Sequence, residues 1–198
     1  MNFLEHWLTE PVTDGVSKLA EKAVAVDVGA NTGTWTAPLA GLFKTVVAIE
    51  PDSRASDSIQ RLENVQIVSA AVGEESGSAT FYKRATTGHG CLTEAHPIGG
   101  EGMAPVPVID TETVSIVSLD DLLADGADFV KMDIEGGEVD ALAGCKDVER
   151  WRRTLFVVEC HDTFPVVLKE LERLGKSVIR IPHPYHSHPG HCWAIGEP

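Results

Sequence analysis

The sequence has few basic residues and no closely spaced cysteines, and each shortage excludes a class of protein. It contains 16 Lys and Arg residues against 30 Asp and Glu residues, so the 198-residue chain carries a formal net charge of −14. Such a chain repels the phosphate backbone, and nucleic acid is not expected as a partner. The four cysteines form no CxxC pair. This pattern favours reduced thiols in a cytoplasm over a secreted disulfide framework or a zinc ribbon.

Long apolar runs are also missing. No segment approaches the roughly 20 apolar residues of a membrane span, and the start MNFLEHWLTEP lacks the basic and apolar regions of a signal peptide. We therefore expect a soluble protein with no membrane partner. The hydrophobic content of 43% is enough for one core. We expect a single domain over residues 1–198, with a helical segment over residues 1–23.

Short runs rich in Val and Ile recur along the chain and predict buried strands. Segments with helical spacing or turn residues separate them, which indicates right-handed βαβ crossovers and a mostly parallel sheet. The predicted fold class is therefore α/β. The runs are VAVDV, TVVAIE, VQIVSAAV, FVKMDI, TLFVVEC and KSVIRI, and a final strand is expected over residues 192–195.

Two helices carry capping signals. Ser118 precedes an apolar stripe as an N-cap would, with Asp121 placed as a capping-box acid. Asp162 is the predicted N-cap of a later helix, which has Pro165 in its first turn and Gly175 as its stop.

The segment over residues 84–113 interrupts this alternation. It is rich in Gly, Pro and Thr, has little periodicity, and carries His89, Cys91 and His96. We expect a loop on the acceptor side of a site. Long loops within compact domains are usually functional or disordered. A lid over a bound acceptor and a passive surface loop both remain open.

The stretch VAVDVGANTG predicts a ligand-binding turn after the first strand. Gly29 allows a tight turn, Gly33 allows the next helix to approach a ligand, and Asn31 tolerates a left-handed conformation. Glu50 ends the next strand, where an acid can accept both hydroxyls of a ribose. An ordinary strand-to-helix turn is the alternative.

The acid at the start of this turn separates two kinds of ribose-containing ligand. Dinucleotide sites cradle a pyrophosphate on a G-x-G-x-x-G turn. Here the turn begins with Asp27, whose carboxylate would repel a pyrophosphate and suit the ammonium and sulfonium groups of S-adenosylmethionine. We therefore favour S-adenosylmethionine as the cofactor.

The motifs DVGANTG, IEP, AAVGEESGSATFY, VSLDDLL, FVKMDIEGGEVDALAG and VVECH together resemble the FkbM family of S-adenosylmethionine-dependent methyltransferases. The resemblance implies a class I (Rossmann-like) methyltransferase fold: a seven-stranded, mostly parallel sheet with helices on both faces and an antiparallel last strand. It also implies methyl transfer to a hydroxyl of a sugar, polyketide or other small molecule. The implied cofactor-binding residues are Asp27, Gly29, Ala30, Asn31 and Gly33 for the methionine part, Glu50 for the ribose, Ser69 and Ala70 in the adenine turn, and Asp133.

Acidic residues and a histidine follow two predicted strands. Asp133 and Glu135 come after the strand over residues 129–132, and Glu159 and His161 close the strand over 155–158. Strand alternation puts each pair on one side, so neighbouring strands would bring the pairs together. We predict Asp133, His161 and Glu135 as catalytic residues, with His161 titrating near neutral pH. A divalent metal bound by Asp133 is the alternative to direct proton transfer.

Lys131 lies within an apolar strand, where pairing with a nearby acid is favoured over a nucleophilic role.

The histidine-rich end favours a hairpin loop over a metal site, because the spacing of its ligand-type residues is irregular. These residues are His183, His186, His188, His191 and Cys192.

The predicted function is that of a methyltransferase acting on a small hydroxylated acceptor. Two alternatives remain. A nicotinamide-dependent oxidoreductase is favoured by Glu50 and opposed by Asp27 and by the absence of G-x-G-x-x-G. A non-catalytic module that binds a cofactor or a metal is the third possibility.

Overall fold

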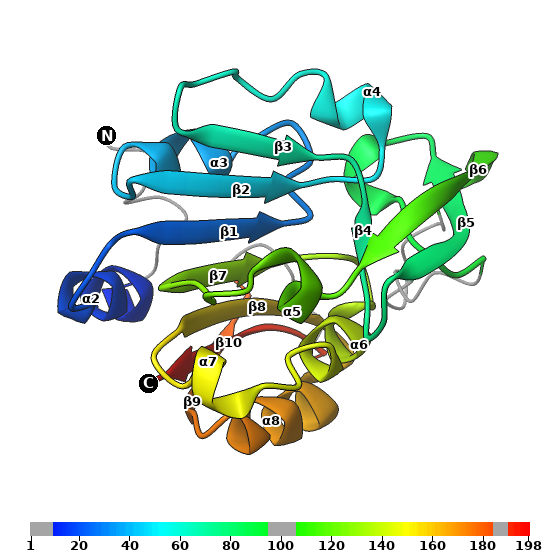
Figure 1. The fold of residues 1–198 in the computed structure, drawn as a ribbon. Helices are drawn as coiled ribbons and strands as arrows, with labels where there is room; N and C mark the ends of the chain where they lie inside the picture. The colour runs from blue at the N-terminus through cyan, green and yellow to red at the C-terminus, as the bar shows by residue number, and fades with distance from the viewer. Residues whose placement is uncertain (1–9, 95–105, 184–189) are drawn as a thin grey trace.

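The computed structural model describes residues 10–94, 106–183 and 190–198, and Figure 1 shows their path. Strands and helices alternate through most of the chain, as the sequence predicts. The elements are α2 (Glu10–Lys18), β1 (Val24–Val28), α3 (Thr36–Ala40), β2 (Thr45–Ile49), α4 (Ser53–Ser56), β3 (Val65–Val68), β4 (Ala71–Val72), β5 (Gly77–Arg84), η1 (Thr87–His89), β6 (Val108–Val117), α5 (Leu119–Leu122), β7 (Phe129–Met132), α6 (Glu138–Ala143), α7 (Val148–Trp151), β8 (Leu155–His161), α8 (Phe164–Arg173), β9 (Ser177–Pro182) and β10 (His191–Glu197).

Seven of the strands form one sheet in the order β3-β2-β1-β7-β8-β10-β9 (Figure 1). Neighbouring strands from β3 to β8 run parallel, whereas β10 is antiparallel to both β8 and β9. The predicted α/β sheet with an antiparallel last strand is therefore confirmed. The strand order reverses between β1 and β7. In such sheets a ligand crevice forms beyond the carboxyl ends of the strands at this point.

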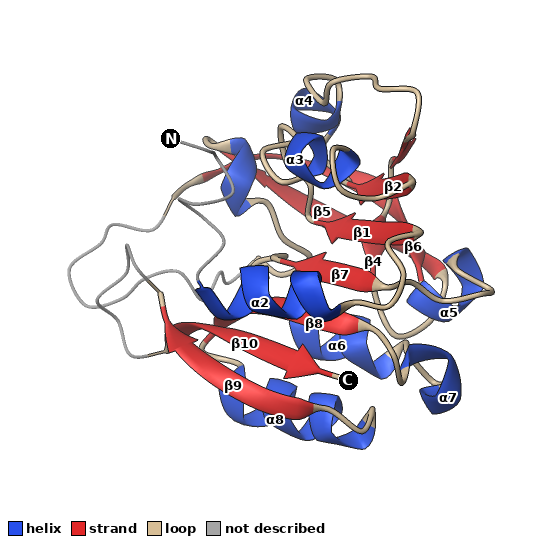
Figure 2. Ribbon diagram, turned by 90° about the vertical axis from the view of Figure 1, so that its left-hand side faces the viewer, coloured by secondary structure: helices blue, strands red, loops and turns tan. Residues whose placement is uncertain are grey.

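Alternate strand positions supply two hydrophobic cores, one on each face of the sheet. Val26 and Val130 belong to the core that includes residues of α6 and α8, whereas Ala25 and Phe129 belong to the core that includes residues of α2 and α3. Figure 2 shows α2 across one face, with α6 and α8 on the other. Helices thus cover both faces, as predicted. None of the helices in the described part of the chain is long and apolar enough to cross a membrane.

A smaller sheet of three strands, in the order β4-β6-β5, is not anticipated by the sequence analysis. β5 and β6 pair antiparallel, and β6 begins at Val108. The expected loop over residues 84–113 is therefore wrong over residues 108–113. Most of this half of β6 is exposed, so backbone pairing with β5 rather than burial holds it in place. The run VQIVSAAV is likewise divided between β3 in the large sheet and β4 in the small one.

One of the two predicted N-caps is confirmed. The Ser118 side chain accepts a hydrogen bond from the Asp121 backbone N–H at 3.1 Å. The predicted Asp162 cap is wrong, because the N-cap of α8 is Thr163 and Asp162 adopts a left-handed backbone with φ of 62°. Gly175 follows this helix with φ of 74°, as expected of its stop.

The turn after β1 has the unusual backbone that its sequence predicts. Gly29, Asn31 and Gly33 all have positive φ, at 73°, 47° and 86°. The prediction that Asn31 takes a left-handed conformation is confirmed. A Cβ atom on Gly29 would lie 1.9 Å from the carbonyl oxygen of Asp133. The turn after β1 and the end of β7 thus approach each other too closely for any side chain at this position.

Gly29→Ala should destabilise the fold through two effects, a left-handed backbone and a clash with the Asp133 carbonyl. Gly175→Ala is the matched control, because Gly175 has nearly the same φ but a Cβ atom there would meet nothing within 4 Å. We expect a loss of about 1–2 kcal/mol for the control and a larger loss for Gly29→Ala. Urea unfolding curves of both variants measure the difference. Equal losses would show that the close approach to β7 contributes nothing.

Candidate active site

A cavity of about 320 Å³ opens at the carboxyl ends of β1, β2 and β7, where the strand order reverses. Its walls include Val28 and Ile49 from the ends of β1 and β2, Ala71 from β4, and Ile134 after β7. Residues 87–93 contribute several further wall residues. The volume lies within the range of small-molecule sites. The position is the one that the strand order predicts for a ligand.

Glu50 lies in this cavity with its carboxylate held by two backbone groups. Oε1 accepts from the N–H of Asp52 at 2.8 Å and Oε2 from the N–H of Asn31 at 2.9 Å. Each oxygen keeps a second lone pair for another donor. Burial raises the pKa of Glu50 to about 7, although both backbone hydrogen bonds oppose this shift. The group therefore titrates near neutral pH in these surroundings.

The residues predicted to bind the cofactor divide into two sets. Gly29, Asn31, Glu50 and Asp133 line the cavity, and so does Ala71, the last residue of the predicted adenine turn over residues 69–71. The cavity wall does not include the remaining predicted residues, which are Asp27, Ala30, Gly33, Ser69 and Ala70. Their contacts with a cofactor stay predictions.

Asp27 is absent from the cavity wall because its carboxylate is turned into a buried ion pair. The side chain is fully buried, and Oδ2 accepts from the Thr36 hydroxyl at 2.7 Å. Lys131 Nζ lies 3.3 Å from Asp27 Oδ1, donates to the Gly29 carbonyl at 2.9 Å, and lies 3.6 Å from Asp133 Oδ2. Burial opposes the charge of Lys131, but the two carboxylates raise its pKa. The prediction that Lys131 pairs with an acid is confirmed.

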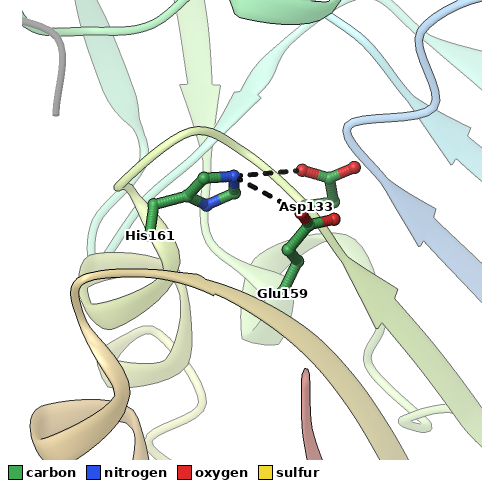
Figure 3. A group of neighbouring side chains, drawn as sticks. All are labelled: Asp133, Glu159 and His161. Atoms are coloured by element: carbon green, nitrogen blue, oxygen red, sulfur yellow. Dashed lines mark ion pairs between the residues drawn. The ribbon is translucent and has the colours of Figure 1, made fainter. Parts of the chain in front are cut away.

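A cluster of carboxylates surrounds His161 at the ends of β7 and β8. His161 Nε2 lies 3.4 Å from Glu135 Oε2, 3.8 Å from Asp133 Oδ1 and 3.8 Å from Glu159 Oε1. Figure 3 shows Asp133 and Glu159 directed toward the imidazole. The expectation that strand alternation brings the two pairs together is confirmed. Asp133 and Glu135 line the cavity, whereas the cavity wall does not include His161.

Glu138 fixes the orientation of His161 from the other side. His161 Nδ1 lies 2.8 Å from Glu138 Oε1, and since a carboxylate can only accept, Nδ1 carries the hydrogen. Glu138 is fully buried and also accepts from the Thr163 hydroxyl at 3.1 Å and the Gly136 N–H at 2.9 Å. The sequence analysis missed Glu138. Its place three residues after Glu135 in EGGE was the available signal.

These carboxylates change the expected acid–base behaviour of His161. Burial lowers its pKa, but the Glu138 hydrogen bond and the charges of Glu138, Glu135 and Asp133 outweigh burial and raise it to about 10. The expectation of titration near neutral pH is therefore wrong for this arrangement of charges. His161 is charged at pH 7.

Glu159 is the most enclosed carboxylate that faces His161 Nε2. Burial, with the charge of Asp133 as a second cause, raises the pKa of Glu159 to about 8. His183 Nε2 lies 3.3 Å from Glu159 Oε1, and the His183 ring stacks on Trp193 at 5.9 Å.

The histidine-rich end adds two residues to the surroundings of this cluster. β9 and β10 pair antiparallel, which confirms the predicted hairpin. His183 contacts Glu159, and the His191 ring lies edge-on to that of His161 with centroids 5.1 Å apart. Residues 186 and 188 of the predicted set lie outside the described residues.

The first part of the predicted loop contacts the cofactor turn. The Thr87 hydroxyl donates to Asn31 Oδ1 at 2.9 Å, and His89 Nδ1 lies 3.7 Å from Glu135 Oε1. Thr87 and Cys91 line the cavity, so this segment forms part of its wall. His96 lies outside the described residues. Whether the segment moves when a ligand binds stays a prediction.

Comparisons with known proteins agree with this geometry. Residues 27–178 match the family model of the methyltransferase FkbM domain, which is more than half of the chain. No curated protein sequence matched the chain.

Solved structures share the fold at low sequence identity. FkbM from Methylobacillus flagellatus KT has a TM-score of 0.59 and 19% identity, with 88% of this chain and 43% of that chain covered. An rRNA methylase from Streptococcus thermophilus has a TM-score of 0.56 and 14% identity, with 96% and 97% covered. A Streptococcus mutans protein in complex with S-adenosylhomocysteine has a TM-score of 0.53 and 13% identity, with 96% and 97% covered. The chain therefore has a class I methyltransferase fold and spans less than half the length of the Methylobacillus protein.

Lys131→Met should be strongly destabilising, because it leaves the buried charge of Asp27 without its partner. We expect a loss of about 3–5 kcal/mol in the free energy of unfolding. The double variant Asp27→Asn, Lys131→Met removes both charges and should recover part of this loss. Urea unfolding measures all three proteins.

The control is Lys18→Met, which removes an exposed ion pair between Lys18 and Asp14 and should change stability little. A Lys131→Met variant as stable as this control would show that the buried pair does not hold the site together.

Proposed function

Because the chain belongs to the FkbM methyltransferase family, we propose that it transfers a methyl group from S-adenosylmethionine to a hydroxyl oxygen of a small-molecule acceptor. The observation that carries this proposal is the cavity at the reversal of strand order, whose wall includes Glu50, Asp133 and Glu135. The first belongs to the end of β2, where a ribose binds in such folds. The others belong to the end of β7, next to His161.

The residues of the cavity fit the methyl donor. Glu50 keeps a lone pair on each carboxylate oxygen for the ribose hydroxyls. Acidic groups in the wall suit the ammonium and sulfonium charges of the donor. The Streptococcus mutans neighbour is in complex with S-adenosylhomocysteine, the product of methyl donation, which supports the same ligand here.

The acceptor is proposed to be uncharged or cationic. Five of the carboxylates in the cavity wall, besides that of Glu50, belong to Glu74, Glu75, Asp133, Glu135 and Asp140, and the described part of the wall contains no Lys or Arg. Phosphorylated or carboxylated acceptors would be repelled. A hydroxyl of a sugar, polyketide or similar small molecule fits this lining.

Methyl transfer requires alignment of the acceptor and removal of its proton. The donor supplies a methyl carbon that the acceptor oxygen attacks while the carbon–sulfur bond breaks and its electrons stay on sulfur. Glu135 is proposed to take the hydroxyl proton. Glu135 lines the cavity, and its backbone is held at φ of 55°, a strained conformation for a residue with a side chain.

The neighbouring groups position this base. Asp133 also lines the cavity but lies 3.6 Å from the ammonium of Lys131, with which it forms an ion pair. His161 stands behind both carboxylates, 3.4 Å from Glu135, with its ring fixed by Glu138. We place Glu135 in contact with the acceptor and His161 as a positioning residue.

A reducing compartment such as the cytoplasm is proposed from the thiols. The described residues include all four cysteines, each of which is buried and outside any disulfide. Nucleic acid is not proposed as an acceptor, because the chain is strongly acidic.

Titration of the protein with S-adenosylmethionine, S-adenosylhomocysteine and NAD tests the choice of cofactor, and Glu50 gives the titration a pH signature. Above pH 7 Glu50 is ionised and accepts from both ribose hydroxyls, and below pH 7 it is neutral. Donor affinity should therefore fall by up to about tenfold from pH 8 to pH 6. Glu50→Gln should weaken binding at pH 8 by about 1–3 kcal/mol and remove the pH dependence.

Calorimetry at each pH measures these affinities. Tighter binding of NAD than of both adenosyl compounds would overturn the methyltransferase proposal in favour of an oxidoreductase. Binding of the donor with no turnover of any hydroxylated acceptor would favour a non-catalytic module.

Glu135→Gln should lower kcat by about 10²–10⁴-fold, because the variant cannot accept the hydroxyl proton. Donor affinity should stay the same. Formation of S-adenosylhomocysteine across a panel of hydroxylated acceptors measures turnover, and Glu135→Asp, which keeps the carboxylate, should retain more activity. Full turnover by Glu135→Gln would remove this residue from the chemistry.

A further inference from the structure

Three side chains at the ends of β7 and β8 offer ligand atoms to a single point. One atom each from Asp133, Glu159 and His161 lies within 4.8 Å of the other two. The Oδ1 atom of Asp133 and the Oε1 atom of Glu159 are each 3.8 Å from His161 Nε2. In Figure 3 these atoms face one another across a small gap.

His161 is held in the orientation that a metal ion requires. Its Nδ1 donates to Glu138, which leaves Nε2 directed at the carboxylates of Asp133 and Glu159. Metal-binding histidines almost always donate their other ring N–H to a carboxylate, a carbonyl or water. The buried Glu138 fills that role here, and its own second oxygen is held by Thr163.

The ligand residues of β8 are buried among other charged groups. Glu159 is only 7% exposed and His161 only 4% exposed. His161 Nε2 and the Glu159 carboxylate lie in ion-pair contacts of 3.3–3.8 Å with each other and with Asp133, Glu135 and His183. Carboxylates gathered this closely repel one another, and a cation between them would relieve the repulsion.

We propose that Asp133, Glu159 and His161 bind one divalent cation, Mg²⁺ or Mn²⁺. Two carboxylate oxygens and one imidazole nitrogen suit these ions, with Mn²⁺ the better match to the nitrogen. Octahedral ligands at about 2.1 Å from the ion lie about 3 Å from one another. The ligand atoms therefore need to close by about 1–2 Å. The carboxylates that now favour a proton on Nε2 would favour the ion in its place.

The position of the site gives the ion a function. Asp133 lines the cavity as well as facing the cluster, so the open coordination positions lie next to the space for the acceptor. An acceptor hydroxyl bound to the ion would lose its proton more easily, and Glu135 is the nearby residue proposed to accept that proton. This catalytic role rests on the proposed methyl transfer. Binding of the ion does not.

Titration of the chelator-treated full chain with Mn²⁺, followed by the electron paramagnetic resonance signal of free Mn²⁺, tests the site without any acceptor. We expect one ion bound per chain. Asp133→Asn and Glu159→Gln should each weaken binding by about tenfold or more, and Glu138→Gln by about 10–100-fold through loss of the His161 orientation. Circular dichroism establishes that each variant is folded, and the partly exposed Asp133 is the variant expected to fold best.

Asp140→Asn is the matched control, because Asp140 lines the same cavity outside the cluster and should leave Mn²⁺ affinity unchanged. Absence of Mn²⁺ binding at millimolar concentration to the folded wild-type chain would overturn the site. An equal loss of Mn²⁺ affinity in Asp140→Asn and Asp133→Asn would also overturn the site. A chain that binds S-adenosylmethionine but does not bind Mn²⁺ would overturn the metal site alone. A chain that binds Mn²⁺ but does not bind S-adenosylmethionine would overturn the methyltransferase proposal alone.

Discussion

The buried ion pair between Asp27 and Lys131 is the interaction on which the arrangement of the site depends. The two residues are register partners on β1 and β7, the strands between which the order reverses. Burial of two charges is costly unless further hydrogen bonds satisfy them, and Thr36 and the Gly29 carbonyl supply those bonds. The ammonium also faces Asp133. One side chain therefore ties the turn after β1 to the start of the acidic cluster after β7.

The sheet itself explains why so many carboxylates meet at one place. β7 and β8 are adjacent and parallel, so their carboxyl ends lie at the same edge, and alternate residues at these ends share a face. Asp133 and Glu135 therefore meet Glu159 and His161 without any long-range loop. Repulsion among these acids favours positive charge at their centre. A proton on His161 meets this need, and a bound cation would meet it equally well.

The sequence predicted the parts of the fold that burial determines. The runs that became β1, β2, β7 and β8 are mostly apolar because both faces of the sheet are covered, and the positive φ values at Gly29 and Asn31 follow from residue type. It did not predict the first half of β6, which cross-strand hydrogen bonds hold in an exposed position. It also missed Glu138, because only the folded chain shows that this carboxylate is turned toward His161.

The Asp27 carboxylate belongs to a correctly predicted turn, but its role in the fold differs from the one that the sequence suggests. From the sequence, an acid before the glycine turn favours a cationic donor by direct attraction. In the fold this acid is fully buried and its charge is balanced by Lys131, so it contributes little net field in the cavity. The proposed preference for a sulfonium over a pyrophosphate therefore rests on the acidic residues that line the cavity, above all Glu50. Asp27 instead supports the turn after β1, because it holds the Lys131 ammonium that donates to the Gly29 carbonyl.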